Sequence, residues 1–211
     1  SRDIFMTEPQ HLSLVAAQNL VTSALLAAGC SPDNAAITAR ALVAAEADGQ
    51  VGHGLSRVPS YAAQAKSGKV NGHAIPQAQS LSPAALRIDA GFGFAYPALD
   101  MAVLKLGQIA PAMGIASATV YRSHHFGQAG AHAEKLAEKG LIGLVFGNSP
   151  KAIAFWGGQA PMLGTNPVAF AAPLPKGPPL VIDFAVSVVA RGKINAAKQA
   201  GETIPLGWAL E

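Results

Sequence analysis

The spacing of the apolar residues changes near residue 76, and this change sets what the chain can fold into. Over residues 9–28 apolar residues recur at three- and four-residue intervals, which is typical of an amphipathic helix. The Ser31-Pro32 pair is a typical N-cap followed by a first-turn proline, and it predicts a second helix that ends near residue 47. A third helix is expected over 59–68. Residues 1–75 are therefore predicted to form a helical N-terminal region.

After Pro76 short apolar runs alternate with helix-like stretches. Strands are predicted around 86–88, 115–122, 141–147, 167–173 and 179–185, and helices over 97–113, 128–139 and 187–201. Alternation of this kind indicates an α/β domain, here residues 76–211. A sheet of this size normally needs further elements to cover it, so we expect the chain to be part of a longer protein, incomplete at its C-terminal end.

The composition of the chain argues against several classes of protein. Half of the 211 residues are hydrophobic and 13% are charged, which indicates a globular protein. The net charge of +3 comes from scattered Lys and Arg, so a nucleic-acid partner is not expected. No apolar run is long enough to cross a membrane, and the N-terminal residues do not resemble a signal peptide. With Cys30 as the single cysteine, the sequence favours the cytoplasm.

Gly52-His53-Gly54 is the first stretch that could support chemistry, and Arg57 follows it by four residues. A helix that begins near Gly54 would place free backbone N–H groups beside the Arg57 guanidinium, where a carboxylate could bind. His53 could act as a general acid, because an imidazole titrates near neutral pH. A helix-capping loop with a surface histidine explains the same residues, and both interpretations stay open.

The second stretch, HHFGQAG at 124–130, lies between a predicted strand and a predicted helix. A glycine loop in this position can bring backbone amides close to a phosphate, although the GxGxxG fingerprint is absent. Metal binding by His124, His125 and His132 is a weaker alternative, because no carboxylate at ligand spacing joins these histidines.

Two polar turns and one acid follow. Asn148-Ser149-Pro150 and Gly164-Thr165-Asn166-Pro167 both come after apolar runs and could be ordinary proline turns. The rings of Phe155 and Trp156 either belong to the core or cover a nicotinamide. Asp183 is the acid in an apolar run, where it either caps the next helix or pairs with a base.

Four segments, taken together, resemble the malate/L-lactate dehydrogenase-like oxidoreductases, which are unrelated to the Rossmann lactate dehydrogenases. They are AEADGQVGHGLSRVPSY, RSHHFGQAG, LVFGNSPKAIAFWGGQAPMLGTNPVAFAAP and PPLVIDFAVSVVARGKI. The resemblance implies a non-Rossmann α/β cofactor-binding domain and a homodimer. It also implies hydride transfer between NAD or NADP, with NADPH favoured, and C2 of a small 2-oxo acid, 2-hydroxy acid or cyclic imino acid.

The resemblance also implies roles for single residues. His53 matches the proton donor, Arg57 the arginine that binds the substrate carboxylate, and Thr165 a substrate contact. Asp183 matches the acid that is linked to the histidine. The implied cofactor contacts are His125, Phe126, Gly127, Gln128, Ala129, Ser149, Asp183, Phe184 and Ala185, and no residue is expected to bind a metal.

One position departs from the family pattern. Members usually have Ser-His-Gly where this chain has Gly52-His53-Gly54, so a hydroxyl of the implied relay is missing. A cyclic imine can already hold a proton on nitrogen, and on this ground pyrroline- or piperideine-2-carboxylate is the favoured substrate. Two alternatives remain: a non-catalytic, nucleotide-binding regulatory domain, and a metal-dependent hydrolase. The histidines of that hydrolase would be His53, His124, His125 and His132.

Overall fold

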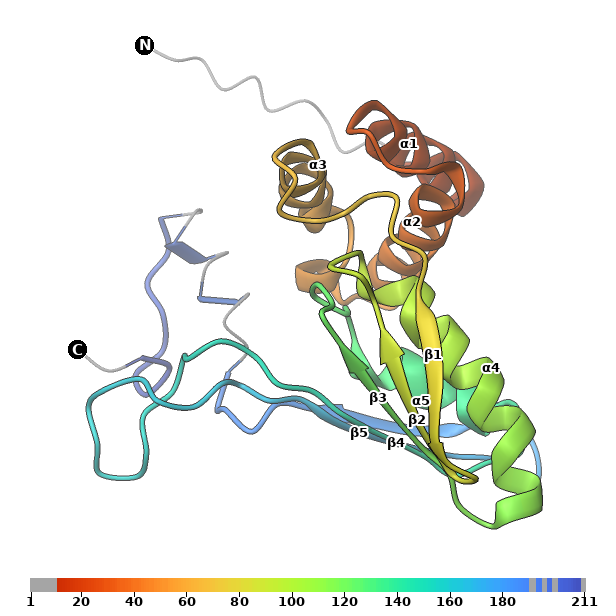
Figure 1. Cartoon of the computed structure of the whole chain (residues 1–211). Helices are drawn as coiled ribbons and strands as arrows, with labels where there is room; N and C mark the ends of the chain where they lie inside the picture. The colour runs from red at the N-terminus through yellow and green to blue at the C-terminus, as the bar shows by residue number, and fades with distance from the viewer. Residues whose placement is uncertain (1–10, 190–192, 195–196, 199–200, 210–211) are drawn as a thin grey trace.

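A computed structural model describes residues 11–189, 193–194, 197–198 and 201–209 of the chain (Figure 1). The N-terminal part is helical. Its elements are α1 (Leu14–Ala27), α2 (Pro32–Ala47), the 3₁₀ turns η1 (Val51–His53) and η2 (Leu55–Arg57), and α3 (Val58–Lys66). This order confirms the three helices that the sequence predicts.

Side-chain caps and a buried apolar stripe explain why these helices form where they do. The hydroxyl oxygens of Ser13 and Ser31 accept hydrogen bonds from backbone N–H groups in the first turns of α1 and α2. Leu25 and Leu42 are completely buried where the two helices meet. The Asn34 side chain donates to two carbonyls of the chain segment that leaves α3, at 2.9 and 3.0 Å, which fastens that segment to α2.

The first sheet has three strands in the order β1-β2-β3, namely Gln77–Ser82, Ala85–Asp89 and Ser117–Tyr121. β1 is antiparallel to β2, and β2 is parallel to β3. The parallel pair is joined by α4 (Ala95–Met113), which runs along the sheet (Figure 1). A crossover helix is what a parallel connection requires. Ile88 of β2 is fully buried in the cluster that this helix covers.

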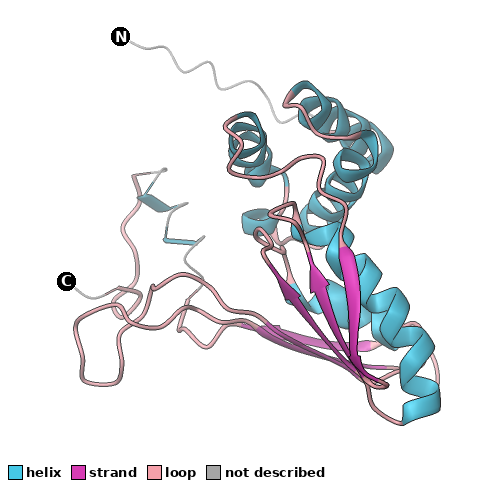
Figure 2. Cartoon of the chain, viewed as in Figure 1, coloured by secondary structure: helices cyan, strands magenta, loops and turns pink. Residues whose placement is uncertain are grey.

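The second sheet is an antiparallel meander of β4 (Gly143–Phe146), β5 (Val168–Ala172) and β6 (Leu180–Phe184). Figure 2 shows this meander beside the first sheet. Helix α5 (Ala129–Ala137) packs on one face, where its alanines meet the buried alanines of β5. Because the contacting side chains are small, the helix lies close to the strands.

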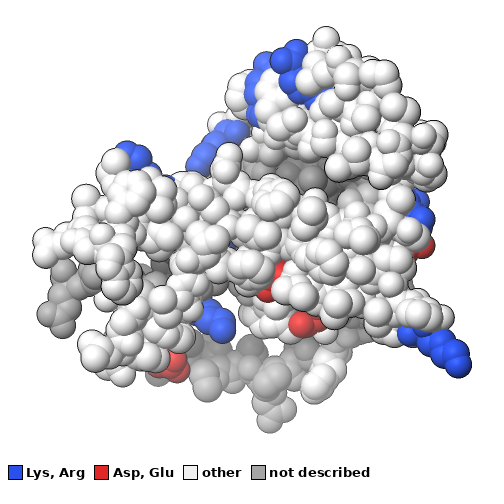
Figure 3. Space-filling model, turned by 90° about the horizontal axis from the view of Figure 1, so that it is seen from below, with Lys and Arg blue, Asp and Glu red and all other residues white. Residues whose placement is uncertain are grey.

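The other face of the second sheet is apolar and exposed. Phe146 is 71% exposed and Phe184 is 53% exposed, and Leu144 and Ile182 share this exposure. Charged side chains are few and dispersed over the surface that Figure 3 shows. Within the part of the chain that the structure describes, no helix is long and apolar enough to cross a membrane.

The structure confirms all the predicted strands and adds β1, which the sequence did not predict. The segment QAQSLS is exposed along its whole length, so it lacks the alternation of polar and apolar residues that reveals a strand. The helix predicted over 187–201 lies partly outside the described residues, and residues 187–189 are not helical. The division at residue 75 stays a prediction, although Phe94 and Tyr96 pack into the helical core.

Gly143→Ala tests how closely α5 approaches β4. A Cβ atom at position 143 would lie 2.7 Å from the carbonyl oxygen of Ala133, so the strand and the helix would have to separate. We expect the variant to lose about 1–3 kcal/mol of unfolding free energy in urea denaturation. Gly52→Ala is the control, because nothing lies within 4 Å of a Cβ atom at that position. Equal stability of the two variants would contradict the packing described.

Candidate functional site

The His53 turn is formed where α2 ends and two short 3₁₀ turns lead into α3. The Glu46 carboxylate accepts a hydrogen bond from the backbone N–H of Leu55 at 2.8 Å, which fixes the start of the second turn. Gly54 lies against α2, where a Cβ atom would be 3.0 Å from Cα of Glu46. The predicted free amides at this terminus are therefore only partly available, because Leu55 already has a partner.

Arg57 folds back over the same turn. Its Nε–H donates to the carbonyl oxygen of Gly52 at 2.6 Å. The terminal amino groups of the guanidinium make no hydrogen bond to any residue that the structure describes. Arg57 is thus held in place by one nitrogen, and the two others remain available to a carboxylate.

His53 is half-buried, and its ring is stacked on that of His125. The ring centroids are 5.2 Å apart and the planes differ by 10°. Nδ1 of His53 is buried and finds no hydrogen-bond partner in the described part of the chain. Burial lowers the pKa of His53, the positive charge of Arg57 lowers it further, and the carboxylate of Asp183 opposes both.

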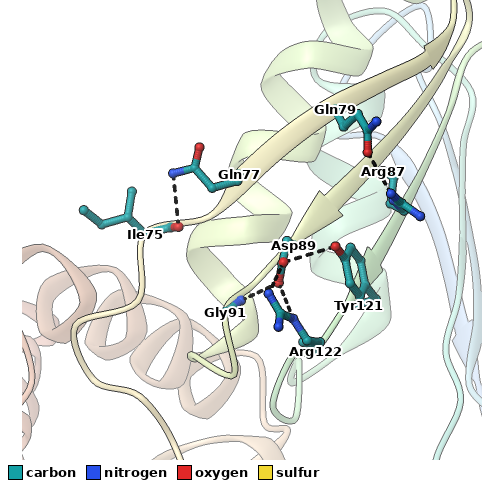
Figure 4. A network of polar contacts seen from close by, with 8 residues as sticks. All are labelled: Ile75, Gln77, Gln79, Arg87, Asp89, Gly91, Tyr121 and Arg122. Carbon is teal, nitrogen blue, oxygen red and sulfur yellow. Dashed lines mark hydrogen bonds and ion pairs between the residues drawn. The ribbon is translucent and has the colours of Figure 1, made fainter.

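The loop that contains the two histidines begins at Arg122, directly after β3. Arg122 forms an ion pair with Asp89 at the end of β2, and Tyr121 and Gly91 donate to the same carboxylate (Figure 4). The Arg122 guanidinium holds the pKa of Asp89 at about 2, so the pair stays charged. Arg122 has a left-handed backbone with φ of 50°, and this ion pair holds it in that conformation.

The far end of the loop is held by buried contacts. Nε2 of His132, on α5, is 2.8 Å from the carbonyl oxygen of Phe126, to which it donates. Gly127 has φ of 73°, and a Cβ atom there would lie 2.8 Å from the Tyr96 hydroxyl, so a glycine is needed. The loop that leads to α5 is therefore fixed at both ends.

The adjacent histidines have different partners. Nδ1 of His125 is 2.7 Å from the hydroxyl of Tyr61, whereas Nε2 of His124 is 3.1 Å from the Gln64 side-chain oxygen. Burial, with nearby positive charge, lowers the pKa of His125 to about 3 and that of His124 to about 4. Both rings are therefore neutral at physiological pH. No group of three or more potential metal ligands occurs among the described residues, so the structure gives no support to the hydrolase alternative.

Asp183 reaches the same loop from β6. Its Oδ2 accepts a hydrogen bond from the backbone N–H of Gly130, in the first turn of α5, at 2.7 Å. It thus caps a helix that precedes it in the sequence, whereas the sequence suggested the next helix or a base. Asp183 makes no hydrogen bond to His53 within the described ranges and acts on it through its charge. Because a carboxylate already occupies this helix terminus, the Gly130 amide is not free for a phosphate.

The two polar turns form a second group. The hydroxyls of Ser149 and Thr165 are 3.0 Å apart, and the side-chain oxygen of Asn166 accepts from the backbone N–H of Ser149 at 3.1 Å. The backbone N–H of Val186 donates to the carbonyl oxygen of Thr165 at 2.9 Å, which ties this group to the end of β6. Ser149 and Thr165, predicted separately, are therefore neighbours.

The remaining predicted residues lie around these two groups. The Gln128 side chain donates to Asp48 at 2.7 Å, Ala129 is buried, and Phe126 packs against the cluster under α5. Phe155 and Trp156 are not core residues, because Trp156 is fully exposed and Phe155 is 57% exposed. Sequence reasoning missed Tyr61, Gln64, Tyr96 and Asn166.

The chain is similar to known proteins over almost its whole length. The malate/L-lactate dehydrogenase family profile matches residues 12–211. A (2R)-3-sulfolactate dehydrogenase (NADP(+)) of Chromohalobacter salexigens is 48% identical over 95% of this chain and 60% of its own length. A Δ1-pyrroline-2-carboxylate reductase of Ancylobacter novellus is 41% identical over 97% of this chain and 60% of its own length.

A solved structure is also similar to this chain. Δ1-piperideine-2-carboxylate reductase of Pseudomonas syringae superposes with a TM-score of 0.83 at 34% identity, over 93% of this chain and 59% of that chain. The chain belongs to the malate/L-lactate dehydrogenase family, and its fold is the mixed α/β fold of that family. It spans about 60% of the length of the relatives that it matches.

The neutral histidines make stability depend on pH. The pKa of His125 is about 3 in the folded chain and near 6.5 when the chain unfolds, so the unfolded state binds the extra proton between these values. Stability is therefore complete above pH 6.5 and falls as the pH decreases below it. Between pH 7 and 5 we expect His125 to account for a loss of about 2 kcal/mol in denaturant titrations. His125→Gln should show a shallower loss, and an unchanged slope would contradict this burial.

Proposed function

We propose that the protein is an NAD(P)-dependent oxidoreductase that reduces C2 of a small 2-oxo acid or cyclic imino acid and oxidises the corresponding product. The observation that supports this most is the combination of His53 with Arg57. A half-buried imidazole lies four residues from a guanidinium whose terminal nitrogens have no partner in the described part of the chain. Such a pair suits a substrate that has a carboxylate beside a reacting centre.

The Arg57 guanidinium would bind the substrate carboxylate. Because its Nε–H already donates to Gly52, the side chain is pre-positioned, and little rotamer entropy is lost when the ligand binds. A bidentate contact from the remaining nitrogens would also fix the orientation of C2 toward His53.

His53 would exchange the proton at the substrate oxygen. When a reduced nicotinamide is bound, it supplies the hydride to C2, and the proton from the imidazolium completes the 2-hydroxy acid. Since burial and Arg57 lower the pKa of His53, its protonated form is scarce at neutral pH and is a stronger acid than an ordinary imidazolium. The charge of Asp183 opposes this lowering and would favour the imidazolium during turnover.

The residues around the histidine loop fit the uncharged nicotinamide end of a cofactor better than a phosphate. Asp183 already occupies the α5 terminus, and the two neutral rings of His53 and His125 offer flat, uncharged surfaces. The residues that would hold the cofactor are therefore His125–Ala129, Phe184 and Ala185, with Ser149 as a hydrogen-bonding group. NADPH is the proposed form, which the NADP(+) in the name of one relative supports.

We further infer a homodimer in the cytoplasm. The homodimer is what the resemblance to the family implies, and a lone cysteine suits a reducing compartment. The proposed ligand is a small molecule that contains a carboxylate group.

Replacement of His53 or Arg57 by alanine tests the proposed roles. In the full-length protein, loss of NADPH absorbance would be followed with pyruvate, oxaloacetate, ketopantoate, pyrroline-2-carboxylate and piperideine-2-carboxylate. We expect His53→Ala to lower kcat by about 100-fold or more, since it removes the general acid, and Arg57→Ala to lower kcat/KM by a similar factor. The control is His73→Ala, because His73 is an exposed histidine outside the site.

Near-normal rates in either site variant would overturn the assignment of that residue. If the wild-type protein binds NADPH but oxidises it with none of these substrates, the regulatory-domain alternative is favoured instead.

Gly52→Ser tests the departure from the family pattern. A Cβ atom at position 52 meets no atom within 4 Å, and Gly52 has no positive φ, so we expect unchanged stability. The hydroxyl next to His53 should raise turnover of 2-oxo acids more than that of cyclic imines, because only the oxo acids depend fully on proton delivery to oxygen. The measurement is the ratio of kcat/KM for the two substrate classes. An unchanged ratio would show that Gly52 does not set this preference.

A further inference from the structure

Tyr61 is a buried tyrosine that the proposed chemistry does not use. It lies on α3 with a relative exposure of 1%, in the helical core, and its hydroxyl points toward the histidine loop. The hydroxyl is 2.7 Å from Nδ1 of His125 and 3.3 Å from the hydroxyl of Tyr96. Among the described residues of the helical core, Tyr61 is thus the one that forms a hydrogen bond with the ring stacked on His53.

The direction of these hydrogen bonds follows from a second donor. The backbone N–H of Gly127 also points at Nδ1 of His125, at 3.4 Å, and an N–H group can only donate. This long contact indicates that Nδ1 is the unprotonated nitrogen. Tyr61 then donates its proton to Nδ1 through the much shorter bond of 2.7 Å, and this stronger bond is the one that holds the tautomer. The Tyr61 oxygen can then accept from Tyr96, so the hydroxyls run in one direction, from Tyr96 to Tyr61 to His125.

The protonation states agree with this direction. Burial raises the pKa of Tyr61 well above 10, so its hydroxyl keeps the proton that it donates. Burial and the positive charge of Arg57 lower the pKa of His125, so the ring is neutral and has one N–H group. With Nδ1 as an acceptor, this N–H group is on Nε2.

Nε2 of His125 is the free end of the chain of hydrogen bonds. It makes no hydrogen bond to a described residue, and it is not completely enclosed, so it remains available to a ligand. The ring is nearly parallel to that of His53, with centroids 5.2 Å apart. A small ligand at the edge of one ring therefore lies within reach of the other.

We propose that Tyr61 is a positioning residue that fixes His125 as the Nε2–H tautomer, so that the ring donates a hydrogen bond to an oxygen atom of the bound ligands. This inference rests on the proposed function, because it concerns the same site. It assigns the second histidine a definite role: His125 is a neutral hydrogen-bond donor, whereas His53 exchanges the proton. The accepting oxygen belongs either to the substrate or to the nicotinamide carboxamide.

The direct test is the tautomer of His125 in the full-length protein. Long-range ¹H–¹⁵N spectra distinguish a protonated ring nitrogen from an unprotonated one, and His125→Gln identifies the signals of this residue. We expect a proton on Nε2 in the wild type and a mixture of tautomers in Tyr61→Phe. The matched control is Tyr121→Phe, which removes a hydroxyl that donates to Asp89 in another network. A proton on Nδ1 in the wild type, or an unchanged tautomer in Tyr61→Phe, would overturn the inference.

Kinetics identify the oxygen that accepts the hydrogen bond. Loss of one neutral hydrogen bond should lower kcat/KM of Tyr61→Phe by about 10-fold, with normal circular dichroism. If the oxygen is on the substrate, the Kd of NADPH stays unchanged; if it is on the carboxamide, this Kd rises by a similar factor. An unchanged kcat/KM and Kd together would contradict the positioning role. The tautomer can be measured even in a protein without enzymatic activity. If the wild type proves inactive, the proposed function is overturned, but the tautomer assignment can still be tested by the spectra.

Discussion

The hydrogen bond between Asp183 and the Gly130 amide joins the second sheet to the loop on which the candidate site depends. Besides this bond, β6 and the histidine loop are connected through the packing of α5 and of Phe126 on the second sheet. The other ties of the loop run to the first sheet through Arg122 and to the helical core through Tyr61. Three layers of the fold therefore meet within residues 122–130, and each layer fixes a different part of this segment.

The electrostatics of the site follow from burial rather than from a concentration of charge. His124 and His125 are neutral because they are enclosed and lie near positive side chains, so neither competes with a bound cation or repels Arg57. The charged groups that remain near His53 are the Arg57 guanidinium, which lowers the pKa of His53, and the Asp183 carboxylate, which raises it. Small movements of either would therefore shift the proton affinity of His53.

The sequence predicts the helices well because caps and periodicity are local signals. Ser31 caps the second helix where the sequence places its start, whereas the first helix begins only after Ser13, later than the apolar pattern suggests. The sequence misses β1 because an exposed edge strand has no apolar face. The sequence also indicates most of the candidate site residues, since glycines and isolated charges within apolar runs can be recognised from the sequence alone.

The roles of Tyr61 and Asn166 cannot be recognised from the sequence, because they depend on partners 64 and 17 residues away. Tyr61 has the spacing of an ordinary core residue, and only its hydroxyl contacts reveal more. The capping role of Asp183 is similarly hidden, because its partner helix precedes it in the chain.

The end of β6 supports both groups of the candidate site within a few residues. Asp183 lies beside the histidine loop, and Val186 holds the turn that contains Thr165. A short extended segment transmits displacement along its length, since its backbone cannot be compressed. The two groups are therefore mechanically coupled: a ligand that draws one of them inward also moves the other, and they are expected to tighten together.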